Sequence, residues 1–218
     1  MACGHSWGDC RVPKQGTHNV DEPGHVIENE ADYGYGDRYP GRRKVILWSR
    51  QPWHSVDCLS NEPMPSGRFA SGVTKTPIGD VHVIGVCIPW RDAHVRTGRH
   101  DREPWEDHLA YLDGLDVVLR ESRDSTSGIV VGDFNQRIPR KYTPRRVADR
   151  LTSVFEDWNI VTTGCIPVVS RQAIDHVALR GDIEAVSVEA WDRVDDQGNR
   201  LSDHDGYAIA VRQTSRGE

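Results

Sequence analysis

Short runs of β-branched and other apolar residues recur along the chain, separated by glycine, proline and polar residues. Such runs predict β-strands. We expect strands at residues 45–48, 68–74, 81–88, 129–131, 176–179, 185–188 and 207–211. In the run at 81–88, apolar residues occupy both alternating positions, which is typical of a strand covered on both faces. We therefore expect this strand to be central in its sheet.

Two segments show helical rather than alternating periodicity. Residues 104–122 place Leu109, Leu112, Leu115 and Leu119 at helical spacing, and Pro104 suits a first turn. A second helix is predicted over residues 144–156. Many strands interrupted by few helices favour an α/β fold in which two packed sheets form a sandwich with helices outside it. A strictly alternating βαβ array is less consistent with this order.

The domain organisation predicted from the sequence is simple. A chain of 218 residues suits one domain with a sizeable core. Residues 1–14 show neither strand alternation nor a helical stripe, and glycine and proline cluster before residue 45. We expect an irregular leader at 1–14, the domain at 15–212 and a tail at 213–218.

Charge and cysteine content restrict the classes of partner and compartment. With 27 Lys and Arg against 33 Asp and Glu, the net charge of −6 gives no general attraction to nucleic acid or anionic membranes. Phosphate recognition must therefore be local. The five cysteines form no CxxC pair, which favours a reducing cytoplasm. No run approaches the roughly 18 apolar residues of a membrane span, so we expect a cytoplasmic monomer.

The strongest local signal is the segment 128–135, Gly-Ile-Val-Val-Gly-Asp-Phe-Asn. An apolar strand here leads into a glycine turn that carries Asp133 and Asn135. A carboxylate can accept a proton from water, and an amide can donate to a phosphoryl oxygen. The same pattern also fits ordinary turn chemistry, so alone it does not decide between the two.

Two further segments place acids and imidazoles at strand edges. Asp175 and His176 open an apolar run, and alternation sends their side chains to opposite faces. Asp203 and His204 lie in a polar loop ahead of the final predicted strand. Asp203 can ligate a hard cation and His204 can transfer a proton. Taken alone, such a pair is more often a hydrogen-bonded surface contact.

The three motifs, in this order, resemble the deoxyribonuclease I-like endonuclease/exonuclease/phosphatase superfamily. The resemblance implies a two-sheet sandwich with its active site at one end, a divalent metal, Mg²⁺ or Mn²⁺, and in-line attack of water on a phosphoester. It implies that Asp133 orients or deprotonates the water and that Asn135 binds the phosphate. It also implies that Asp203 ligates the metal, while His204, held by Asp175, stabilises the phosphoryl group or moves a proton.

The amino-terminal region departs from the pattern of that superfamily. The family carries a metal-binding glutamate in an early Gln-Glu pair, and the counterpart here is Gln15-Gly16. Glycine offers no ligand, and the family's first strand is missing before it. Either the amino terminus is foreshortened or wrongly started, or the chain is a degenerate relative. Three other glutamates could replace the missing metal ligand, namely Glu22, Glu28 and Glu30. The simpler interpretation is that they are solvated carboxylates in loops.

Other residues near the motifs suggest how a substrate would be held. Trp90 follows a predicted strand and is a candidate for base stacking, and Arg137 opens a basic segment that could line a phosphate backbone. That segment could equally be the solvated start of a helix. Relatives commonly carry Tyr or His at the position of Cys87, and a cysteine there is best interpreted as a buried thiol. The basic residues are Arg137, Arg140, Lys141, Arg145 and Arg146.

The leading hypothesis is a metal-dependent phosphodiesterase of nuclease type. Nucleic acid is favoured over lipid or inositol phosphate because no apolar membrane-docking loop is apparent. The alternatives are a phosphatase or phospholipase of the same superfamily, or a catalytically impaired scaffold that binds phosphorylated ligands without turnover. Gly16 is the feature that favours the scaffold.

Overall fold

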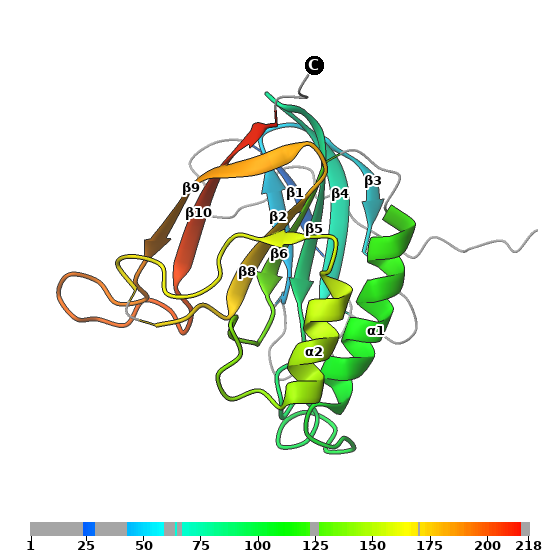
Figure 1. The fold of residues 1–218 in the computed structure, drawn as a ribbon, viewed down its shortest axis with the longest axis vertical. Coiled ribbons are helices and arrows are strands. Elements are labelled where there is room, and N and C mark those ends of the chain that lie inside the picture. Colours follow the sequence, from blue (N-terminus) through cyan, green and yellow to red (C-terminus); the bar gives the residue numbers. More distant parts are fainter. Residues whose placement is uncertain are drawn as a thin grey trace, which may run out of the picture.

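A six-stranded mixed sheet forms the centre of the molecule (Figure 1). The computed structural model describes residues 24–28, 43–58, 64, 67–122, 127–169 and 171–214. In the sheet, β5 and β6 are parallel and the other neighbours are antiparallel. In spatial order its strands are β3 (Trp53–Asp57), β4 (Phe69–Thr76), β5 (Gly79–Cys87), β6 (Gly128–Asp133), β8 (Asp175–Arg180) and β7 (Asn159–Ile160).

Two helices, α1 (Glu106–Glu121) and α2 (Arg145–Val154), cover one face of this sheet (Figure 1). Ile84 of β5 and Val130 of β6 pack there against Leu112 and Leu115 of α1, all four fully buried. Fully burying one such side chain contributes about 1.5–3 kcal/mol. This face is therefore the main hydrophobic core, and it holds β5 and β6 rigidly in register.

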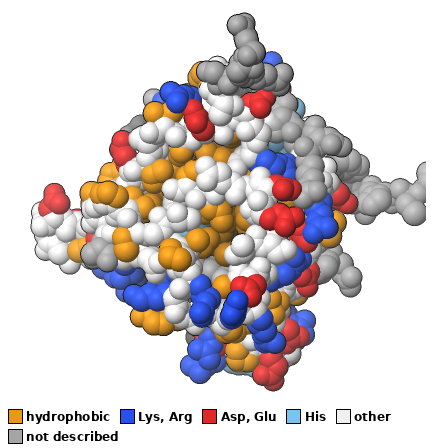
Figure 2. All heavy atoms as spheres, viewed as in Figure 1, with side chains coloured by type: hydrophobic (Ala, Val, Ile, Leu, Met, Phe, Trp, Pro, Cys, Tyr) orange, Lys and Arg blue, Asp and Glu red, His pale blue; other side chains and the backbone are white. Residues whose placement is uncertain are grey.

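The opposite face carries two separate antiparallel pairs, β1 (His25–Glu28) with β2 (Ile46–Ser49) and β9 (Ile183–Trp191) with β10 (Gly206–Gln213). Val131 of β6 contacts the apolar clusters beneath both pairs, so both lie on one face. Within the described residues no strand joins the two pairs. Figure 2 shows hydrophobic side chains gathered in the middle of this side, between the β9–β10 and β1–β2 pairs. The second layer is therefore divided.

The predicted two-sheet α/β architecture is confirmed. All seven predicted runs lie in strands, both predicted helices form, and β5 lies inside its sheet between β4 and β6. Three strands were not predicted, namely β1, β3 and β7. The side chains of β3 are exposed or half-buried, and β7 has two residues, so neither shows a clear apolar alternation. β1 lies in the glycine-rich and proline-rich region before residue 45.

The compartment and the domain bounds are less constrained by the structure. Cys58 is disulfide-bonded, which is typical of oxidising compartments and does not support the expected reducing cytoplasm. Cys87 and Cys165 are free thiols. In the part of the chain that the structure describes, no helix is long and apolar enough to cross a membrane. The predicted leader at 1–14 lies outside the described residues.

Candidate active site

Pairing of β6 with β8 brings the first two motifs together. Asp133 at the end of β6 lies directly opposite Asp175 at the start of β8. Directly opposed residues of an antiparallel pair project from the same face, so both carboxylates leave the same end of the sheet. His176 points the other way, as alternation predicts, and is buried with its Nε2 2.9 Å from the carbonyl oxygen of Gln136.

The turn that aims Asp133 requires a glycine at position 132. Gly132 has a φ of 142°, in the region that L side chains rarely adopt. A Cβ atom there would lie 1.9 Å from the carbonyl oxygen of Val86 on β5. The glycine of the motif therefore allows two backbones to approach closely just before the catalytic carboxylate.

Asn135 fixes the orientation of the Asp133 carboxylate. Its backbone N–H donates to Asp133 Oδ1 at 2.8 Å, and its Nδ2 donates to Asp133 Oδ2 at 2.7 Å. The same Nδ2 donates to the carbonyl oxygen of Ile88 at 2.8 Å. Both N–H bonds of the amide are thus engaged within the protein. In this structure Asn135 orients Asp133, and its predicted contact with phosphate stays a proposal.

His204 reaches the site from the loop between β9 and β10. Its Nδ1 donates to Asp175 Oδ2 at 2.6 Å, a charge-assisted hydrogen bond. The pKa of His204 is raised to about 9, chiefly by this bond and also by the charges of Asp175 and Asp133, while burial opposes the shift. The imidazole is therefore a cation at neutral pH, and its Nδ1 is held by Asp175.

Asp133 lies in an environment that disfavours its negative charge. Its pKa is raised to about 6, chiefly by burial and also by the nearby Asp175 carboxylate, while the charge of His204 opposes the shift. One ligand atom from each of Asp133, Asp175 and His204 lies within 4.8 Å of the others. Two carboxylates this close repel each other, so a bound cation would relieve the strain between them.

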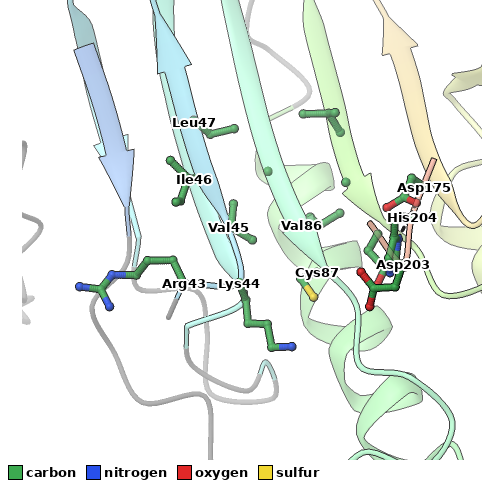
Figure 3. A pocket seen from close by; sticks show the side chains of 14 residues that line it. Arg43, Lys44, Val45, Ile46, Leu47, Val86, Cys87, Asp175, Asp203 and His204 are labelled. Carbon is green, nitrogen blue, oxygen red and sulfur yellow. Dashed lines mark hydrogen bonds and ion pairs between the residues drawn. The ribbon is translucent and has the colours of Figure 1, made fainter. Parts of the chain in front are cut away.

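These residues line one end of a pocket of about 400 Å³ on the divided face (Figure 3). Asp203 lines the pocket beside His204 but does not belong to the cluster that lies within 4.8 Å. Arg43 and Lys44 line it from the β2 side. Glu28 at the end of β1 pairs with Arg43 at 3.7 Å and is not among the pocket residues. Gly16, Glu22 and Glu30 lie outside the described residues.

An ion-pair network that the sequence did not predict holds the loop of His204. Arg171 binds the Asp205 carboxylate with two hydrogen bonds, from Nε to Oδ2 at 2.9 Å and from Nη2 to Oδ1. Its Nη2 also donates to Asp192 Oδ1 at 2.9 Å. The Asp205 carboxylate is buried and also accepts the backbone N–H of Arg193 at 3.1 Å. Arg171 therefore fastens the residue after His204 to the segment that leads into Asp175.

Of the other residues that the sequence singled out, Cys87 lines the pocket, whereas Trp90 and Arg137 do not. Trp90 is 38% exposed and is not among the residues that line the pocket, while Arg137 lies 5.8 Å from the ring centroid of Tyr142. Cys87 does line the pocket as a buried free thiol, as the sequence suggested, and it accepts Arg68 Nη1 at 3.4 Å. Burial raises the pKa of this thiol, so it stays protonated.

Solved structures with the same fold come from several organisms, and their low identity shows the fold alone. An endonuclease/exonuclease/phosphatase from Beutenbergia cavernae is 14% identical with a TM-score of 0.52, covering 78% of this chain and 47% of its own. The 3′ phosphatase NExo from Neisseria, bound to a product DNA hairpin, is 14% identical with a TM-score of 0.56. The match covers 76% of this chain and 73% of NExo. D. rerio TDP2 complexed with a single-strand DNA product is 12% identical with a TM-score of 0.53. The match covers 77% of this chain and 72% of TDP2.

The chain thus spans about half the length of the first of these structures. No curated protein matches it. The sequence profile of the Endonuclease/Exonuclease/phosphatase family matches residues 9–204, which is most of the chain and includes all three motifs. This chain therefore belongs to the endonuclease/exonuclease/phosphatase family.

Proposed function

We propose that this protein is a metal-dependent phosphoester hydrolase of nuclease type, which cleaves a phosphodiester with an activated water. One observation carries the proposal, namely the convergence of Asp133, Asp175 and His204 at one end of an open pocket. The three residues come from three distant segments, and each supplies a group that phosphoryl transfer requires.

The donor set suits a hard divalent cation. Carboxylate oxygens are the ligands that Mg²⁺ and Mn²⁺ prefer, and the carboxylates of Asp133 and Asp175 lie close together in this cluster. Asp203, which lines the pocket beside His204, would hold the metal. When bound, the cation supplies neutralisation of phosphoryl charge.

The protein's own residues divide the remaining work. Asp133, aligned by Asn135, orients a water molecule and accepts its proton, and a pKa of about 6 suits a base that operates near neutral pH. His204, protonated and held by Asp175, presents its charge to a phosphoryl oxygen and can return a proton to the leaving group. The mechanism thus requires Asp175 to remain ionised as the partner of His204.

Nucleic acid is the substrate class that we favour. Two proteins of the same fold, NExo and TDP2, were solved with DNA products. In this chain Arg43 and Lys44 line the pocket opposite the catalytic cluster, where cations can contact a phosphate backbone. A monomeric state remains part of the proposal.

A second candidate is a scaffold that binds phosphorylated ligands without turnover. The observation that favours it is the metal site: among the described residues, no glutamate joins the cluster of Asp133, Asp175 and His204. A site with few protein ligands holds Mg²⁺ weakly. The two candidates differ in one measurable property, which is metal-dependent hydrolysis.

The test combines calorimetric titration of Mg²⁺ or Mn²⁺ with cleavage of a labelled oligonucleotide, using EDTA as the blank. His204→Ala and Asp203→Ala should each lower the rate by roughly 10² or more, because charge neutralisation and proton transfer each contribute about that much. His54→Ala, which removes an exposed imidazole on β3, is the matched control. Variants of His204 and Asp203 that keep their rate within about threefold would overturn the mechanism. Metal-independent ligand binding without cleavage would support the scaffold.

A further inference from the structure

The loop between β6 and α2 holds an aromatic side chain in solvent. Tyr142 is 77% exposed, whereas most aromatic rings bury their faces on folding. Its neighbours at 139–141 and 144 are also exposed, while Thr143 is buried and attaches this stretch to the protein.

The backbone of this loop is fixed at several points. Gln136, near its start, is buried and donates from Nε2 to the carbonyl oxygen of Val147 in α2 at 3.3 Å. Within the loop, the carbonyl oxygen of Ile138 accepts the N–H of Gly164 at 2.6 Å. The exposed ring of Tyr142 is therefore presented by an ordered loop, which lowers the entropic cost of binding a ligand there.

Two cations lie over the ring. Arg137 Cζ is 5.8 Å and Lys141 Nζ is 5.3 Å from the centroid of Tyr142, within the range of cation–π contacts. Figure 2 shows Lys and Arg side chains along the lower part of the molecule, where Figure 1 places this loop. Because the whole chain carries a net charge of −6, this concentration of positive charge is local.

The loop starts directly after Asp133, at the end of β6. It contains Asn135, whose side chain aligns the Asp133 carboxylate. Gln172, in the segment that leads into Asp175, donates from Nε2 to the carbonyl oxygen of Pro139 at 3.1 Å. The segment that follows Asp133 and the segment that precedes Asp175 are thus joined at this loop.

We propose that Tyr142, with Arg137 and Lys141, forms a binding site for an unpaired nucleotide next to the scissile phosphodiester. The base stacks on the Tyr142 ring, and the two cations contact the adjoining phosphates. A base inside a duplex is already stacked on its neighbours, so this site selects single-stranded nucleic acid. The inference rests on the proposed action on nucleic acid and specifies which form of it binds.

Binding without turnover tests this site separately from catalysis. Fluorescence anisotropy in EDTA compares oligothymidine of about 12 nucleotides, close to the usual site size, with an abasic oligomer of equal length and charge. Base stacking contributes about 1–3 kcal/mol, so Tyr142→Ala should weaken oligothymidine binding about 5-fold to 100-fold and leave abasic binding unchanged. Tyr142→Phe, which keeps the ring, should retain the preference of the wild type.

The charged residues have their own comparison. Arg137→Gln and Lys141→Gln should weaken both oligomers and reduce the salt dependence of binding. Arg212→Gln, whose side chain is 68% exposed on β10 and lies outside the basic segment, is the matched control. The proposed nucleotide site is refuted if the wild-type protein binds the two oligomers equally. It is also refuted if Tyr142→Ala weakens the binding of both oligomers equally. Because no cleavage is measured, neither result bears on whether the protein hydrolyses phosphodiesters.

Discussion

Substituting Arg171 by methionine should destabilise the loop that carries His204 much more than an ordinary ion-pair mutation. The change leaves the buried Asp205 carboxylate without its bidentate partner. Breaking a fully buried ion pair in this way costs about 3–5 kcal/mol. Arg171 is 30% exposed, so water screens part of the loss, and we expect about 2 kcal/mol. For a chain of this size, that lowers Tm by about 4–8 °C.

Urea and thermal denaturation of two matched variants check this magnitude. Arg212→Met removes a pair of similar length with Glu184, 2.7 Å, on the same β9–β10 hairpin. Its side chains are 68% and 44% exposed, so the loss should stay below about 1 kcal/mol. Arg171→Met with Asp205→Asn should recover part of the stability, because the unpaired charge is gone. If Arg171→Met is no more destabilising than Arg212→Met, Arg171 does not fasten this loop.

Two further predictions concern the site itself. Because the pKa of His204 is raised from 6.5 to about 9 in the folded protein, its pairing with Asp175 should stabilise the fold fully below about pH 6.5 and lose this effect as the pH rises through about 9. NMR titration of the His204 ring in EDTA measures this pKa in the wild type and in Asp175→Asn. A wild-type pKa near 6.5 that does not change in Asp175→Asn would contradict the pairing. Gly132→Ala should cost about 3 kcal/mol or more, because the new Cβ meets the carbonyl oxygen of Val86 at 1.9 Å and φ is unfavourable. Gly198→Ala has positive φ but open space around it, so equal urea midpoints for the two variants would refute the steric argument.

The sequence could predict those parts of the site that short motifs encode. Asp133 and Asn135 follow an apolar strand, and strand pairing alone then places Asp175 opposite Asp133. His204 was identified from motif order. Its contact with Asp175 depends on how the β9–β10 hairpin folds back over the sheet.

The features that were not predicted depend on contacts between distant, unremarkable residues. Arg171 and Asp205 lie 34 positions apart, and neither belongs to a recognisable pattern. The buried pair formed by Gln136 and His108, 2.8 Å apart, is likewise invisible before the helices pack on the sheet. Periodicity also gave no indication that the second layer is divided, because it reports which strands exist and not how they pair.

The division of the second layer gives the two residues of the Asp175–His204 pair unequal local stability. Asp175 lies on β8, between β6 and β7 in the six-stranded sheet. His204 lies on a hairpin whose strands, within the described residues, pair only with each other, and whose side chains are largely exposed or half-buried. Local opening of that hairpin requires less free energy than global unfolding. The bond between Asp175 and His204 therefore joins a persistent part of the molecule to one that opens more often, and opening the hairpin removes the imidazole from the site while the central sheet stays folded.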